Sequence, residues 1–316
     1  MSGGTDAGLG EGGAPARAPK GAILAAFAAI YLIWGSTYLG IRVGVETIPP
    51  FLMAASRFAI AGVVLFTVLR LRGAPWPTLL QWRDQAVVGV FLLLGGNSVV
   101  TWCELRVPSG ITSLVLGAGP IIVLALNWIR PGGSRPTAKL AVGVLIGVAG
   151  LVILLGPGSI PAGYRPPLSR IFILLASSLC WWTGSFYSKH RAVRTPLIMA
   201  SAMQMICGSL CIFLAAQFLD RESGFSLSHV SGRSWIAFAY LTTVGSAVVF
   251  PIYVWLLGHT TPAKASTFAY VNPVIAIILG WAILREPLNF RIALATAIII
   301  GAVVLINLTR AKPRDA

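Results

Sequence analysis

The chain carries one pattern twice, because five apolar stretches between residues 22 and 155 recur with matching landmarks between residues 169 and 308. The matched pairs lie about 150 residues apart. They are Gly35, Ser36 and Tyr38 with Gly184, Ser185 and Tyr187; Pro50, Met53, Ala54 and Gly62 with Pro196, Met199, Ala200 and Gly208; Gly95 with Gly245; and Ser113, Pro120 and Trp128 with Ser266, Pro273 and Trp281. Their shared order and spacing indicate an internal duplication. Since each copy has an odd number of stretches, copies that cross the same layer are expected to be inverted relative to each other.

Composition places these stretches in a lipid bilayer. Apolar residues make up 56% of the chain and charged residues 10%, against roughly a quarter charged in an ordinary soluble domain. Each stretch has the length that an α-helix needs to cross the hydrocarbon core, about 20 residues, and a helix satisfies its own backbone groups there. The sequence therefore predicts an all-α integral membrane protein with ten transmembrane helices in two inverted five-helix repeats. The expected spans are 22–41, 51–69, 86–105, 109–129, 138–155, 169–188, 197–219, 234–257, 264–284 and 290–308.

The expected organisation is a flexible cytoplasmic tail (1–21), a first repeat (22–155), an outer linker (156–168), a second repeat (169–308) and a second cytoplasmic tail (309–316). With the amino terminus inside, 15 of the 24 Lys and Arg residues fall in cytoplasmic segments and 8 in outer loops, with Arg57 inside a span. The positive-inside rule then predicts that both termini are cytoplasmic. The net charge of +15 is explained by an anionic inner leaflet, so the expected partners are the bilayer and a small-molecule substrate, without a nucleic acid.

Several short motifs resemble those of a known family. They are Trp34-Gly35-Ser36-Thr37-Tyr38, Arg57-Phe58, Pro108-Ser109-Gly110, Tyr270-Val271-Asn272-Pro273 and Glu286 after the ninth span. Across residues 22–308 the chain resembles the EamA-type exporters of the drug/metabolite transporter superfamily, in particular the group that exports amino acids and related metabolites. The resemblance implies a ten-helix carrier of the bacterial inner membrane.

Polar and aromatic side chains inside the spans are the candidates for a substrate pathway, because in lipid they need partners or water and should face the bundle interior. The alternative for each is a hydrogen bond between helices or a place in an interfacial aromatic belt. The candidates are Trp34, Tyr38, Arg57, Asn97, Trp182, Tyr187, Thr267, Tyr270 and Asn272.

The two copies differ at three of these positions. Tyr270 and Asn272 correspond to glycines of the first copy, and Arg57 corresponds to a methionine, so the fold itself does not require those side chains. Pro273 removes a backbone donor and predicts a break or kink in the ninth span beside this polar site. Arg57 could hold a substrate carboxylate, or it could pair with Glu46 or Glu104.

Carboxylates are absent from the middle of every expected span, although a proton-coupled carrier usually needs an embedded titratable group. Glu104, at the end of the third span, is the remaining candidate, so facilitated diffusion and proton antiport both stay open. The four cysteines show no metal-binding spacing, and neither a metal nor another cofactor is expected.

Three function classes follow from this reading. An inverted repeat can expose a central site alternately to the two sides of a membrane, which favours a carrier that exports small metabolites such as zwitterionic or aromatic solutes. A sugar or nucleotide-sugar carrier of the same superfamily would need paired basic residues deep in its cavity, and only Arg57 and Lys264 approach that. An intramembrane enzyme would need a nucleophile with a base, or a metal dyad, within the spans; the sequence contains neither pattern.

Overall fold

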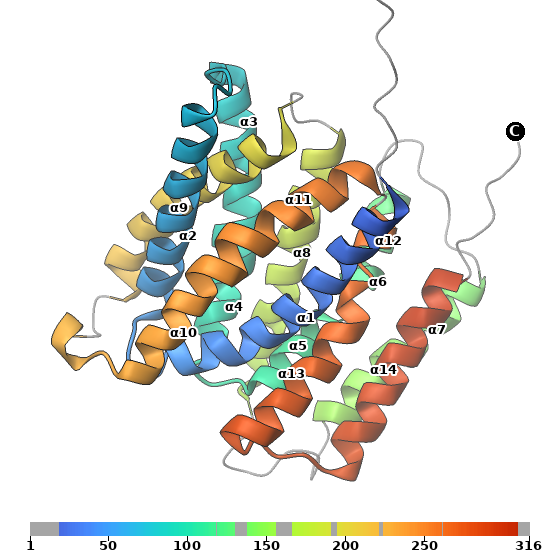
Figure 1. The fold of residues 1–316 in the computed structure, drawn as a ribbon. Helices are drawn as coiled ribbons and strands as arrows, with labels where there is room; N and C mark the ends of the chain where they lie inside the picture. Colours follow the sequence, from blue (N-terminus) through green and yellow to red (C-terminus); the bar gives the residue numbers. More distant parts are fainter. Residues whose placement is uncertain are drawn as a thin grey trace, which may run out of the picture.

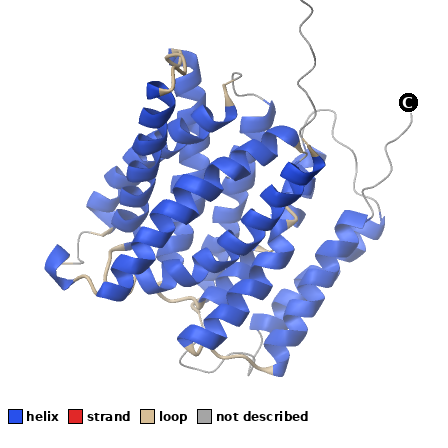
Figure 2. Cartoon of the chain, viewed as in Figure 1, coloured by secondary structure: helices blue, strands red, loops and turns tan. Residues whose placement is uncertain are grey.

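The computed structural model describes residues 19–117, 119–129, 138–155, 166–190, 195–220, 224–260 and 262–308. Within these ranges the regular secondary structure is entirely helical (Figure 2). The first half contains α1 (Lys20–Gly44), α2 (Pro50–Leu71), α3 (Leu79–Gly89), η1 (Val90–Ser98), α4 (Val99–Cys103), α5 (Ser109–Leu116), α6 (Gly119–Ile129) and α7 (Ala138–Leu155). The second half contains α8 (Leu168–His190), α9 (Leu197–Leu219), η4 (Leu227–His229), α10 (Gly232–Thr242), η5 (Thr243–Val248), α11 (Val249–His259), α12 (Pro262–Ala265), α13 (Phe268–Leu284) and α14 (Phe290–Leu308).

By length and composition, six of these helical stretches can cross a membrane. They are Lys20–Gly44, Pro50–Leu71, Leu79–Cys103, Leu168–Lys189, Leu197–Leu219 and Gly232–His259, and shorter apolar helices lie at Leu145–Leu154, Val271–Leu284 and Phe290–Ala302. Large apolar side chains cover the outside of the bundle, for example Val63 and Val64 on α2 and Phe213 and Leu214 on α9, each about half exposed or more. An apolar exterior of this kind fits a lipid solvent, and the chain is an all-helical membrane protein.

Contacts between the two halves come in matched pairs. α2 packs against α9, α5 against α13 and α7 against α14, and α7 and α14 lie side by side along one edge of the bundle (Figure 1). α1 packs against α10, α11 and α13, while α8 makes the equivalent contacts with α3, η1 and α6. These pairings, taken span by span, are found again when the halves are exchanged.

Close contacts at glycines give the direction of these pairs. On α7, Gly147 faces Ala302 and Gly150 faces Ile299, so α7 and α14 are antiparallel. Gly62 faces Met205 and Ile206, while Leu52 bonds Asp220, so α2 and α9 are also antiparallel.

The third and the eighth helical stretch, which correspond to each other in the two halves, each contain a segment that is not a regular α-helix. The third helical stretch contains η1 and the eighth contains η5, both wide π-helical segments. Gly95 lies in η1 and its sequence partner Gly245 lies in η5. Such widened turns occur frequently at functional sites, and both segments face the centre of the bundle, as described below.

The observed helices differ from the expected spans in three places. The third stretch begins at Leu79, so Asp84 lies inside α3. The expected span 109–129 is divided into α5 and α6. The ninth span is interrupted after α12, at Ser266 and Thr267, and α13 then continues through Pro273. Pro273 is the sixth residue of α13, so the chain is not broken there. Losing one donor removes a single bond of the second turn, and a kink at Pro273 stays a prediction.

Some expectations fall on residues outside the described ranges. They are the tail up to residue 18, residues 156–165 of the linker, the tail at 309–316, and the side chain of Tyr270.

Candidate functional site

A cavity inside the bundle is enclosed by helices of both halves. Its empty volume is about 710 Å³ with its open end included. The first half contributes Trp34, Thr37, Tyr38, Ile41, Arg57, Gly96, Asn97, Val100 and Leu116, and the second contributes Ser177, Ser178, Trp181, Trp182, Gly245, Phe268 and Asn272. Six of the nine residues predicted from the sequence therefore surround one space, namely Trp34, Tyr38, Arg57, Asn97, Trp182 and Asn272. Whether they line a substrate pathway stays a prediction.

Aromatic rings form one wall of the cavity, with Trp34 at its centre. The Trp34 ring centroid lies 5.5 Å from Trp181, 4.9 Å from Tyr253 and 5.1 Å from Phe268. Trp182 stacks on Phe268 at 5.9 Å. Ring faces attract cations and flat apolar groups, so this wall can bind an ammonium group or an aromatic ring.

Arg57 brings a positive charge to the cavity although its side chain is only 2% exposed. Its Nη2 donates to Oδ1 of Asn97, which lies in η1. Its Nε has no hydrogen-bond partner among the residues that the structure describes. The sequence suggested Glu46 or Glu104 as its ion-pair partner, but Arg57 forms an ion pair with neither of these two described residues. One donor of the guanidinium is therefore buried and unsatisfied.

Asn272 joins two helices at the edge of the cavity. With its amide oriented so that nitrogen faces the carbonyl groups, Nδ2 donates to the carbonyl oxygens of Tyr31 (3.2 Å) and Phe268 (3.1 Å). Asn272 thus ties α13 to α1, which is the packing alternative that the sequence left open.

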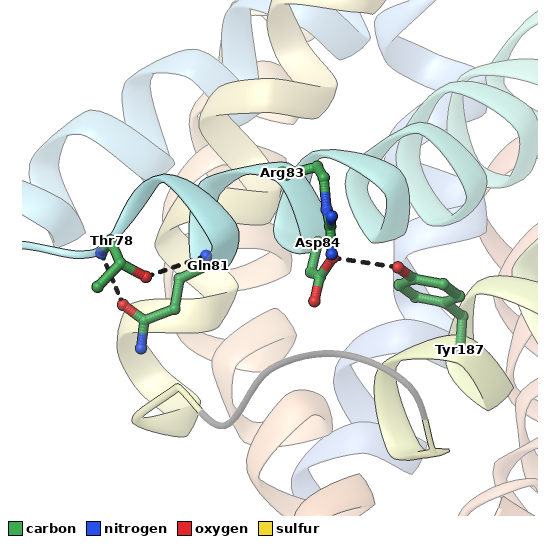
Figure 3. A network of polar contacts seen from close by, with 5 residues as sticks. All are labelled: Thr78, Gln81, Arg83, Asp84 and Tyr187. Carbon is green, nitrogen blue, oxygen red and sulfur yellow. Dashed lines mark hydrogen bonds and ion pairs between the residues drawn. The ribbon is translucent and has the colours of Figure 1, made fainter.

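Two predicted residues lie outside the cavity lining. Thr267 bonds the hydroxyl of Tyr31 at 2.7 Å, at the turn between α12 and α13. Tyr187 of α8 donates to Oδ1 of Asp84 at 3.1 Å, and Arg83 bonds the same oxygen (Figure 3). Asp84 is 1% exposed, so Tyr187 stabilises a buried carboxylate where α3 meets α8.

Sequence reasoning missed several lining residues. Trp181 is adjacent to Trp182, and adjacent helical residues point about 100° apart, so the sequence alone did not reveal that both reach the cavity. Ser177, Ser178 and Phe268 carried no signal that distinguishes them from packing residues.

Glu286 connects two motifs that carry the family resemblance. Its carboxylate accepts from the backbone amides of Ser109 (2.8 Å) and Gly110 (3.2 Å) and from the Ser109 hydroxyl (3.0 Å). These amides are the free donors at the start of α5. A Cβ at Gly280 would clash with Oε2 of Glu286, so the glycine makes room for this carboxylate.

The fold and the cavity together define a class: a multi-pass helical membrane protein that can enclose a small molecule between its two halves. Among the described residues, no group of three or more His, Cys, Asp and Glu side chains is placed to hold a metal ion.

Comparisons with known proteins identify the family. The sequence pattern of the EamA-like transporter family matches residues 19–156 and again residues 168–308. The chain belongs to this family, and it is a membrane transporter rather than an enzyme.

Relatives agree with this assignment. The chain is 36% identical over 297 residues to the uncharacterized inner membrane transporter YedA of Escherichia coli strain K12, with 92% of this chain and 94% of the relative covered. It is 26% identical to the uncharacterized transporter YvbV of Bacillus subtilis, with 93% of each covered. A solved crystal structure, 23% identical, matches 92% of this chain and 97% of its own with a TM-score of 0.63, and supports the fold alone. The chain is thus a multi-pass inner-membrane transporter that handles a small-molecule substrate in a lipid environment.

Proposed function

We propose that this transporter exports amino acids or related small metabolites by alternating access, through the cavity between its halves. The observation that carries the proposal is the composition of the cavity wall. Both halves contribute to it, so a change in their packing can open it to one side and then to the other. The wall combines aromatic ring faces with one guanidinium, and these groups complement the ammonium and carboxylate of an amino acid.

The proposal includes ten spans in two inverted repeats, 22–155 and 169–308, with both termini in the cytoplasm. Three observations support it: the family pattern matches twice, within three residues of the repeat bounds, the contacts between halves are symmetric, and α7 and α14 are antiparallel, as are α2 and α9. Ten alternating spans give the same directions for these pairs. The proposed cytoplasmic location of both termini rests on the charge bias of the loops.

A sugar or nucleotide-sugar carrier is the alternative within the superfamily. A phosphate-bearing solute would require several cations in the cavity. Among the described residues that line it, Arg57 is the one cationic side chain, and Lys264 is not part of the lining. The cavity therefore favours a solute with a single carboxylate.

Overexpression in bacteria tests this function. Cells producing the chain should resist growth-inhibitory amino acids and their analogues, and should hold a lower intracellular concentration of the protective solute. Trp34→Leu, in the cavity wall, should abolish the protection. The matched control is Trp281→Leu, because Trp281 lies on the outside of α13 and is 55% exposed.

Equal protection by both variants at equal membrane abundance would refute the assignment of the cavity. Protection only against sugar phosphates would favour the alternative carrier.

A further inference from the structure

Glu104 is a buried carboxyl group whose local contacts leave it unsatisfied. It caps the carboxyl end of α4 and its side chain is 0% exposed. Neither Oε1 nor Oε2 has a hydrogen-bond partner among the residues that the structure describes. The sequence left Glu104, at the end of the third span, as the remaining candidate for proton coupling, and the structure buries its side chain completely.

The groups near Glu104 come from four elements. They are Tyr38 and Arg42 of α1, Arg57 of α2, Cys103 of α4 and Glu286 after α13. Arg42 donates to the backbone carbonyl of Glu104, and Arg57 donates to Asn97, so neither arginine pairs with the carboxyl group. Glu286 adds a second carboxylate nearby.

An ionised carboxylate in this environment is unfavourable. Burying one without a hydrogen bond or an ion pair costs far more than burying the neutral acid, and the second carboxylate increases that cost. The neutral acid is the form that this conformation accommodates.

Glu104 also lies between two cavities. Val100, one helical turn earlier, lines the central cavity, as do Tyr38 and Arg57. Trp102 and Leu105, on either side of Glu104 in the sequence, line a second cavity with Glu46, Asp220 and His229. The second cavity lies on the side of the loops that follow α1 and α9.

We propose that Glu104 is a proton-binding site that exchanges its proton for the ammonium group of an amino-acid solute; this rests on the proposed function. In the solute-free carrier the carboxyl is protonated. When a zwitterion binds, its carboxylate accepts from the guanidinium of Arg57, which lines the cavity, and its ammonium group approaches Glu104. The O–H bond of Glu104 then breaks and the proton passes to water, so that proton and solute occupy the carrier in turn.

Infrared spectroscopy of the purified, solute-free carrier tests the proton directly. At neutral pH the wild type should show the carbonyl stretching band of a protonated carboxylic acid, and Glu104→Gln should lack it. Glu46→Gln is the matched control, because it removes an exposed carboxyl group and should leave the band unchanged. Absence of the band in the wild type, or its persistence in Glu104→Gln, would overturn the proposal. Absence of the band from the wild type refutes the proposal even if the variant fails to fold.

Flux in proteoliposomes tests the exchange, with radiolabelled L-threonine and L-phenylalanine as probes. In the wild type, a pH gradient should drive the probe toward the acidic side, against its own gradient. Glu104→Gln should lose this accumulation and retain only a gradient-independent flux. Wild-type flux that ignores the pH gradient would contradict the proposal while leaving the export function intact. A lack of flux for both probes would instead remove the proposed amino-acid function, and with it the ammonium exchange, while the infrared result would still decide whether Glu104 holds a proton.

Discussion

Arg57 and Asn97 are joined by a hydrogen bond, and both residues line the cavity. This bond can stabilise the packing of α2 against η1, and it can also orient the guanidinium toward a solute. Arg57 is buried on α2, and its guanidinium lies over the ring of Phe58 at 4.5 Å from the centroid. Asn97 is held in the widened turn of η1. A substrate carboxylate would meet a guanidinium that Asn97 has already oriented.

Arg57→Lys should lower transport at least about tenfold, because an ammonium group cannot keep the bond to Asn97 and present a second donor in a fixed plane. The measurement is the initial rate of solute counterflow in proteoliposomes at equal protein content. Arg70→Lys is the control, since Arg70 lies at the end of α2, away from the cavity lining. A wild-type rate for Arg57→Lys would leave Arg57 with a purely structural role.

A methyl group added at Gly119 would be crowded mainly by one atom of Trp182. A Cβ at this position would lie 2.5 Å from Nε1 of Trp182, and Trp182 is 2% exposed. Gly119→Ala should therefore destabilise the protein by about 1–3 kcal/mol, seen as a lower unfolding midpoint in detergent. Gly301→Ala should have almost no effect, because no atom of the residues that the structure describes lies within 4 Å of the added Cβ. Equal midpoints for the two variants would contradict the packing described here.

Residue type was a partial guide to the site. Exposing the polar groups of Trp, Tyr, Arg and Asn to lipid costs free energy, so these residue types predicted that Trp34, Arg57 and Asn97 face the interior of the bundle. The same rule selected Tyr187, whose partner is Asp84, because a buried polar contact and a substrate contact satisfy the hydroxyl equally well. Only the structure separates these two uses.

At the scale of the helix, the centre of the bundle is built from interrupted elements. The fourth and ninth spans are divided, and η1 and η5 are wide turns. Apolar periodicity predicts that a span exists, but a glycine or proline within it does not show where the chain turns. Pro273 was the obvious candidate for a break, and the turn lies earlier, at Ser266 and Thr267.

The start of α5 depends on a residue from the other half of the chain. Glu286→Ala would leave the amides of Ser109 and Gly110 without their acceptor, which should cost about 1–3 kcal/mol. The expected result is a lower unfolding midpoint of the detergent-purified protein. Glu46→Ala, which removes an exposed carboxylate, should leave the midpoint unchanged. A Glu286→Ala protein as stable as the wild type would show that α5 does not need this cap.

At the scale of the whole molecule, the two halves enclose the cavity and an apolar cluster separates it from the second one. The cluster contains Ile41, Val45, Ile48, Met53 and Leu241. Ile41 lines the central cavity, whereas Val45 and Ile48 line the second. An alternating-access cycle would have to separate this cluster to release a solute on that side.

The apolar composition and the length of the stretches predicted the all-helical membrane class, because these two features determine it almost alone. The cavity could not be predicted in the same way. It depends on which residues of eight helical elements converge, as Ser178 and Gly245 do, and neither residue is distinctive in the sequence.

Alternating access is the central claim, and a single cysteine in the cavity tests it most directly. In a background with the four native cysteines replaced, Ser178→Cys places a thiol in the cavity wall, and Leu179→Cys places one on the outside of α8, where Leu179 is 46% exposed. A membrane-impermeant thiol reagent should modify the cysteine at 178 from either side of the membrane, with the ratio shifted by the transported solute, and should not modify the one at 179. Modification at 178 from one side alone, whatever the solute, would contradict the account.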